Sequence, residues 1–204
     1  MKNKNKQTGV NGRLVTYDTT LRDGGQGEGI DFSVRDMLDI TERLDASGVH
    51  YIEGGWPGSN PRHAEFFRQA RKLRLKRARL VAFASTRRPG IKCHQDKSLR
   101  ALIAAGTQAM AIFGKSWILH TELMKITLEE NLKMIGETVA YLKGRGKEVV
   151  YDAEHFFDGY KDNPGYALLT LLAALRNGAD WLVLCDTNGG TMPDEVGRIT
   201  AEVG

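Results

Sequence analysis

Cysteine, proline and long apolar runs are all scarce in this sequence. Only 2 of its 204 residues are cysteines, and Cys93 and Cys185 lie far apart, so neither a disulfide framework nor a thiolate metal site is expected. No apolar stretch approaches the roughly 18 residues of a membrane span, and the polar residues 1–13 lack the apolar core of a signal peptide. We therefore expect a cytoplasmic protein without membrane contact, with a disordered tail over residues 1–13 and one domain over residues 14–204.

A strong excess of one charge is also absent. Lysine and arginine total 29 against 25 aspartates and glutamates, a net charge of +4, and the basic residues are spread along the chain. Their densest run inside the domain, Arg68–Arg79, is interpreted as the solvated face and end of a helix. No nucleic-acid-binding motif accompanies the charge, so nucleic acid is not an expected partner. The apolar content of 41% is enough for a sizeable core.

What the sequence does contain is a repeated alternation of apolar strand-like runs and segments of helical period. The strand-like runs lie at Leu14–Leu21, Tyr51–Trp56, Leu80–Ser85, Ala109–Phe113, Glu148–Ala153 and Trp181–Asp186. Between them, apolar residues recur at helical spacing. The alternation predicts parallel strands joined by helices.

Helix-end signals agree with this pattern. Ser33-x-x-Asp36 and Thr127-x-x-Glu130 have the spacing of capping boxes, and Pro164 and Pro193 suit the first turn of a helix. Two architectures fit six such units: an open doubly wound sheet and an eight-stranded barrel. The glycines of Gly25-x-Gly27-x-Gly29 miss the spacing of a dinucleotide-binding loop, which argues against the first.

The distribution of polar residues favours the barrel. They cluster at or just after the carboxyl ends of the predicted strands: Arg22, Asp23, Glu53, Ser85, Lys115, Asp152, Glu154, Asp186 and Thr187. In a barrel these ends converge on one site. We therefore predict an α/β fold of the TIM (β/α)8 type, of which this sequence holds about the first six βα units and ends before strand 7. Such a partial barrel has unpaired edges, so poor solubility or oligomerisation is expected.

Three groups near these strand ends have the chemistry of a substrate site. Arg22 and Asp23 could hold an oxyanion and a hard divalent ion, or form a structural ion pair beneath a loop. Asp152 and Glu154 share a strand face, so both would point into the barrel, as a substrate or metal site or as a structural network with lysine or arginine. Thr187 follows the last strand, where its hydroxyl could bind a carboxylate or simply support a turn.

Several segments together resemble the DRE-TIM metallolyases, barrel enzymes that condense or cleave acyl-CoA thioesters on a divalent metal. The matches include Tyr17–Gly29, Tyr51–Pro61, Glu148–Lys161 and Trp181–Gly190, and the likeness covers almost the whole chain from Leu14 onward. Within that superfamily the chain is similar to the isopropylmalate and homocitrate synthase family, and its glycine-rich loops are most similar to the citramalate synthase branch.

The resemblance implies roles for individual residues. Asp23 would be a ligand of a divalent metal (Mg, Mn or Zn), whose remaining ligands, a His-x-His pair on strand 7, lie outside this sequence. Arg22 would be catalytic and would contact the keto acid. Glu154 would also be catalytic.

Three further residues are assigned to substrate binding: Thr187, Glu53 and Asp152. Thr187 would contact the substrate's carboxylate, while Glu53 could instead be a core partner of Arg22. Arg87 and Lys115 could meet the phosphates of coenzyme A, or could pair with neighbouring carboxylates. His120 is interpreted as incidental, in a loop.

The implied activity is that of a citramalate synthase, a metal-dependent acyltransferase. It would condense acetyl-CoA with pyruvate to citramalate and coenzyme A, the entry to isoleucine biosynthesis by the pyruvate route, and would act as a homodimer. Two alternatives stay open: a 2-isopropylmalate or homocitrate synthase, and a non-catalytic barrel remnant, because the His-x-His ligands are absent from this chain. The 204-residue chain alone is expected to be inactive.

Overall fold

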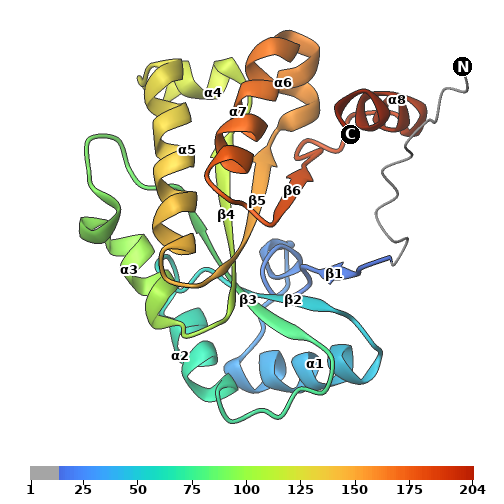
Figure 1. Ribbon diagram of the computed structural model, residues 1–204. Coiled ribbons are helices and arrows are strands. Elements are labelled where there is room, and N and C mark those ends of the chain that lie inside the picture. The colour runs from blue at the N-terminus through green and yellow to red at the C-terminus, as the bar shows by residue number, and fades with distance from the viewer. Residues whose placement is uncertain (1–13) are drawn as a thin grey trace, which may run out of the picture.

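The structure is a computed structural model that describes residues 14–204, so the predicted tail over residues 1–13 lies outside the described residues. Six parallel strands form one sheet whose spatial order follows the chain. The strands are β1 (Tyr17–Asp18), β2 (Tyr51–Gly55), β3 (Arg79–Ser85), β4 (Ala109–Lys115), β5 (Glu148–Glu154) and β6 (Trp181–Leu184). The sheet curls into part of a barrel, which confirms the predicted fold class (Figure 1).

Helices connect successive strands. The α-helices are α1 (Val34–Ala46), α2 (Pro61–Ala70), α3 (Lys97–Ala104), α4 (Ile118–Leu123), α5 (Leu128–Lys143), α6 (Phe156–Asp162), α7 (Pro164–Arg176) and α8 (Pro193–Val203), with short 3-10 helices η1 (Gly24–Gln26) and η2 (Cys93–Gln95). In Figure 1, α5 and α7 lie side by side along one face of the sheet, whereas α8 lies apart from them. None of the helices in residues 14–204 combines the length and apolarity that crossing a membrane requires.

Alternation along the strands divides the interior into two apolar clusters. Ile52, Met110 and Tyr151 belong to a large cluster between the sheet and the helices. Their strand neighbours Tyr51 and Val150 belong to a smaller cluster on the opposite, concave face. Burial on both faces is the reason the central strands carry almost continuous apolar sequence, as barrel strands do.

Local chemistry sets several helix ends where the sequence predicts them. Ser33 and Asp36 form a complete capping box at α1, and Thr127 accepts from the backbone N–H of Glu130 at α5. Pro164 and Pro193 occupy the first positions of α7 and α8. These signals are encoded within a few residues, so they need no tertiary partner.

The two outer strands are shorter than predicted. β1 has 2 residues instead of the run Leu14–Leu21, and β6 ends at Leu184 rather than at Asp186. Each has a neighbouring strand on one side only within the described chain, so fewer backbone groups are held in a ladder. The predicted polar residues therefore lie in loops at both edges.

Candidate active site

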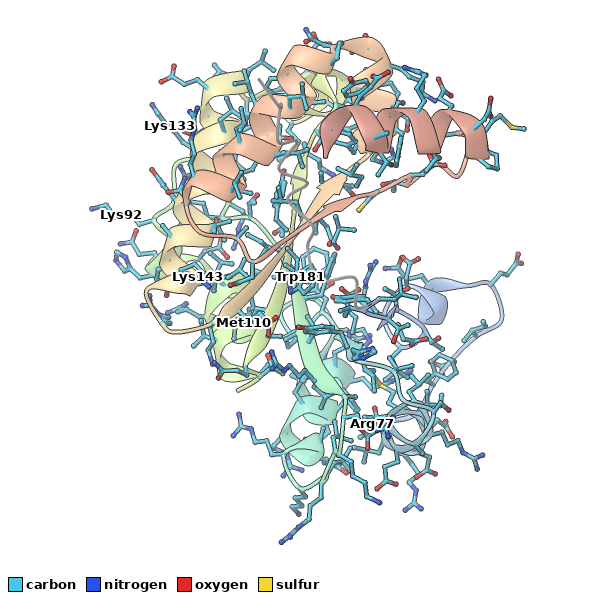
Figure 2. All side chains as sticks on the ribbon, turned by 45° about the vertical axis from the view of Figure 1, so that its right-hand side comes forward. Arg77, Lys92, Met110, Lys133, Lys143 and Trp181 are labelled. Carbon is cyan, nitrogen blue, oxygen red and sulfur yellow. The ribbon has the colours of Figure 1, made fainter. Side chains whose placement is uncertain are left out.

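A cavity of about 650 Å³ lies on the concave face of the sheet and extends along the strands, from Tyr51 and Trp181 at their amino ends to Glu154 and Thr187 at or beyond their carboxyl ends. All six strands or the loops that follow them contribute to its lining. The lining residues are Val15, Tyr17, Thr19, Arg22, Asp23, Gln26, Tyr51, Trp56, Phe83, Phe113, Val150, Asp152, Glu154, Trp181, Val183, Cys185, Asp186 and Thr187. Figure 2 shows the side chains of the described residues. Trp181, which lines the cavity, lies near the middle of the view, and Lys92 and Lys133 lie at its periphery.

Arg22 is fixed at the cavity by a buried network from the first two strands. Its Nε donates to Oε1 of Glu53 at 2.5 Å, and the hydroxyl of Tyr17 donates to Oε2 of the same carboxylate at 2.6 Å. The Glu53 side chain has no exposed surface and is not among the lining residues, so it reaches the cavity through Arg22. Burial alone would lower the pKa of Arg22, but the negative charge of Glu53 raises it, which keeps the guanidinium charged.

Asp23 lies beside Arg22 at the mouth of the cavity. Its Oδ1 accepts from Nη1 of Arg22 at 2.8 Å, and its side chain is 60% exposed. A carboxylate suits a hard divalent ion. However, residues 14–204 bring no three side chains of His, Cys, Asp or Glu together in a way that could hold a metal. The described residues therefore do not form a metal site by themselves.

Asp152 and Glu154 both line the cavity, as their shared strand face requires. Glu154 forms an ion pair with Lys115 at the end of β4. Burial raises the pKa of Asp152 to about 8, and the negative charge of Glu53 adds to this shift. The two carboxyl groups thus have different environments although they are two residues apart.

Thr187 lies in the loop after β6 and faces the same cavity. Its Oγ1 accepts from the backbone N–H of His155 at 2.9 Å, which ties the loop to the end of β5. The preceding Asp186 accepts from both the backbone N–H and the hydroxyl of Thr191, which closes the turn. The Thr187 hydroxyl proton remains available to a ligand oxygen.

An aromatic wall, defined as Trp56, Phe83 and Phe113, bounds the cavity and was not anticipated from the sequence. Phe83 and Phe113 stack with ring centroids 5.3 Å apart, and Trp56 meets each ring edge-on. The guanidinium carbon of Arg22 lies 4.2 Å from the centroid of Phe83. Large side chains near the carboxyl ends of neighbouring strands were the available sequence signal, but their contact depends on the sheet register.

Arg87 pairs with neighbouring carboxylates, which is the second of the two roles predicted from the sequence. Arg87 is buried between Glu130 and Glu137 of α5, with donor–acceptor distances of 2.7 and 2.6 Å. Its charge is therefore matched within the fold, and it is not available to a phosphate.

The placement of His120 in a loop was wrong. His120 lies in α4, and its ring packs edge-on against His155 with centroids 4.3 Å apart. Trp117 packs near both rings. The contact joins the segments after β4 and β5, a tertiary relation that the spacing of the two histidines did not indicate.

Comparison with family models places residues 13–204 in a match to the model described as HMGL-like. Among curated proteins, the chain is 58% identical over 192 residues to the (R)-citramalate synthase of Aquifex aeolicus, covering 94% of this chain and 36% of that protein. It is 31% identical over 188 residues to the 2-isopropylmalate synthase of Streptococcus gallolyticus, covering 92% and 35%. The chain thus spans about a third of the length of these relatives.

Among solved structures, the chain resembles the HMG-CoA lyase of Bacillus subtilis with a TM-score of 0.74. The sequence identity is 16%, and the match covers 94% of this chain and 64% of the other. At this identity the likeness concerns the fold, which it supports across nearly the whole chain.

Proposed function

The chain belongs to the HMGL-like family, and from this premise we propose that it carries part of the active site of a citramalate synthase. The reaction is the condensation of acetyl-CoA with pyruvate to citramalate and coenzyme A. The single observation that carries the proposal is the position of Arg22, held by Glu53 at the mouth of a cavity of substrate size. The higher identity to an (R)-citramalate synthase than to a 2-isopropylmalate synthase, 58% against 31%, supports the choice of branch.

Arg22 is proposed to bind the oxygens of the keto acid and to stabilise the oxyanion that forms when its carbonyl is attacked. Two of its nitrogens already donate to Glu53 and Asp23, and this fixes the plane of the guanidinium before a substrate arrives. Donors fixed in this way stabilise a developing charge without reorganisation. Glu53 is therefore proposed as the residue that orients Arg22.

The aromatic wall favours a keto acid with an apolar side chain. Trp56, Phe83 and Phe113 line the cavity, and Phe83 lies against Arg22. The methyl group of pyruvate suits this apolar wall, whereas the second carboxylate of 2-oxoglutarate would find no polar partner on it. This argument supports pyruvate over 2-oxoglutarate, and the choice between pyruvate and 2-oxoisovalerate rests on the identity to the relatives.

The other sequence-predicted residues complete the proposed site. Thr187 would donate its hydroxyl to the substrate's carboxylate, and Glu154 would present its carboxylate to the reacting groups from β5. Asp23 would supply one ligand to a divalent metal (Mg, Mn or Zn), with the remaining ligands from outside the described residues; no step proposed here depends on that ion. We further propose that the whole protein is a cytoplasmic homodimer that serves isoleucine biosynthesis.

A chimeric protein provides the test. The segment of the Aquifex aeolicus (R)-citramalate synthase that matches this chain is replaced by residues 14–204, and release of coenzyme A from acetyl-CoA is measured with pyruvate, 2-oxoisovalerate and 2-oxoglutarate. We expect release with pyruvate above the other two. Arg22→Gln in the same chimera should lower kcat by about 100-fold to 1,000-fold, because it removes an oxyanion donor.

The possible outcomes separate the alternatives. The unmodified parent protein, prepared in parallel, shows that the assay works. Preference for 2-oxoisovalerate or 2-oxoglutarate would favour a 2-isopropylmalate or homocitrate synthase. A folded chimera that releases coenzyme A with none of the three would contradict the proposal and favour the non-catalytic alternative.

A further inference from the structure

Asp152 is a carboxyl group at the cavity wall to which the proposed reaction assigns no role so far. It lies on β5 opposite Phe113 of β4 and Val183 of β6 in the strand register, and it is half-buried. Within residues 14–204 its side chain takes part in no hydrogen bond or ion pair, although it lines the cavity. A half-buried carboxylate beside Glu53 and Glu154, with no cation of its own, is less favourable than a neutral carboxylic acid.

The cations near Asp152 already have carboxylate partners. Arg22 pairs with Glu53 at 2.5 Å and with Asp23 at 2.8 Å. Burial raises the pKa of Glu53, but both of its oxygens accept a hydrogen bond, from Arg22 and from Tyr17, which is the pattern of a carboxylate.

The second cation is matched in the same way. Lys115 of β4 pairs with Glu154, which lies on the same face of β5 as Asp152. The remaining titratable neighbours are Tyr17 and Cys185, and burial raises the pKa of each, so neither adds a positive charge. Among residues 14–204, four carboxyl groups therefore share two cationic side chains, and the group without a partner is Asp152.

We propose that Asp152 is held as a neutral carboxylic acid and is the proton donor of the cavity, with the carbonyl oxygen of a bound 2-keto acid as its acceptor. This inference rests on the proposed function and deepens it by naming the acid of the reaction. The raised pKa of Asp152, about 8, agrees with the geometry, since a group that is neutral at pH 7 can donate where a carboxylate cannot.

Asp152 gives up its proton as the new carbon–carbon bond forms. When the nucleophilic carbon of the acetyl thioester bonds to the keto carbon, the electron pair of the carbonyl bond moves to its oxygen. That oxygen forms an O–H bond as the O–H bond of Asp152 breaks, which gives a tertiary alcohol and the Asp152 carboxylate. The carboxylate then recovers a proton from water at the open side of the cavity. Arg22 stabilises the same oxygen until the proton arrives.

The protonation state is tested first, on the 204-residue chain itself. Aspartate carboxyl carbons are labelled with ¹³C and titrated by NMR with EDTA present, so that no cation shares the cavity. The Asp152 signal is identified by its loss in Asp152→Asn, or in the smaller Asp152→Ser if the first variant does not fold. Asp39→Asn, which removes an exposed carboxyl paired with Arg35 on α1, is the matched control. We expect the Asp152 signal to titrate near pH 8.

The donor role is tested second, by calorimetric binding of pyruvate at pH 6, 7, 8 and 9 under the same conditions. The affinity of the unmodified chain should fall about tenfold between pH 7 and pH 9, because the protonated fraction of a group with a pKa near 8 falls by that factor. Asp152→Asn keeps an N–H donor that does not titrate, so its affinity should change less than twofold. Asp39→Asn should behave like the unmodified chain.

The results that would overturn the proposal are distinct. An Asp152 signal that titrates near pH 4 would refute the neutral acid and leave the proposed function intact. A signal near pH 8 combined with the same pH dependence of pyruvate binding in both chains would refute the donor role alone. If no chain binds pyruvate at any pH, the donor role is refuted, whereas the proposed function is decided separately by the release of coenzyme A from the chimera.

Discussion

Arg22 and Glu53 form a buried ion pair in which each side chain depends on the other. The Arg22 side chain is 16% exposed and that of Glu53 is fully buried. Removing Arg22 leaves the buried Glu53 carboxylate without a cation, which usually costs about 3–5 kcal/mol, whereas Arg22 without Glu53 keeps Asp23 as a partner. Replacing both partners by apolar side chains avoids that penalty.

A double-mutant cycle tests this dependence. Arg22→Met should lower the free energy of unfolding in urea by about 3–5 kcal/mol and Glu53→Leu by less, because Arg22 keeps Asp23, while the double variant should lose clearly less than the sum of the two. Arg35→Met removes an exposed pair with Asp39 and should cost less than about 1 kcal/mol. Additive losses in the cycle would show that the pair is not coupled.

The stability of the chain should also depend on the protonation of Asp152. Its pKa in the folded chain, about 8, lies above the ordinary aspartate value, so the folded state holds the proton more tightly than the unfolded state does. The free energy of unfolding therefore falls as pH rises from about 4 to about 8, and the loss is complete above pH 8. Asp152→Asn cannot ionise and escapes this loss.

Urea unfolding of the two chains at pH 5 and pH 8 measures the effect. We expect the difference between Asp152→Asn and the unmodified chain to shift in favour of the variant by roughly 2–4 kcal/mol across this range, from about 1.4 kcal/mol per pKa unit. The comparison cancels other groups that titrate between these pH values. Parallel pH profiles would indicate that Asp152 is ionised in the fold throughout.

At the scale of elements, glycine determines how closely α6 approaches β4. A Cβ atom on Gly159 would lie 2.2 Å from the backbone oxygen of Ser116, and a backbone atom cannot rotate away. A Cβ atom on Gly197 in α8 would meet nothing within 4 Å. The same substitution should therefore have opposite effects in the two helices.

Calorimetry on the two alanine variants tests this difference. Gly159→Ala should destabilise the chain by about 1–3 kcal/mol or more, since the helix must move away from the strand. Gly197→Ala should stabilise it by about 0.5–1 kcal/mol, because alanine favours an exposed helix interior. An unchanged melting temperature in Gly159→Ala would mean that the contact between α6 and the end of β4 yields easily.

The sequence predicted the central strands, the helix ends marked by Ser33 and Pro164, and the shared face of Asp152 and Glu154, because each follows from residues close together in the chain. It did not predict the shortness of β1 and β6, since strand length at an edge depends on which neighbours pair. The aromatic wall and the contact of His120 with His155 were missed for a related reason. Both join segments from different βα units, and their distances depend on sheet register rather than on sequence spacing.

For the molecule as a whole, β6 leaves an apolar strand exposed at one edge of the described sheet. Trp181 and Val183 are 42% and 38% exposed, and β6 pairs with β5 alone within residues 14–204. On the neighbouring helix α7, Leu169 and Leu175 are 46% and 54% exposed. An apolar strand edge with free backbone donors and acceptors favours pairing with another copy of the chain.

Sedimentation velocity tests this expectation for the 204-residue chain. At tens of micromolar the average mass should exceed the 22.6 kDa of one chain and should fall on dilution. Val183→Lys places a charge on the edge strand β6, on the face that lines the cavity, and should shift the distribution toward 22.6 kDa, because a lysine on an edge strand opposes pairing. Leu123→Lys adds the same charge to α4, where the leucine is 70% exposed and remote from β6, and should leave association unchanged. A single species of 22.6 kDa at every concentration would mean that the exposed edge is stable in solution without a partner.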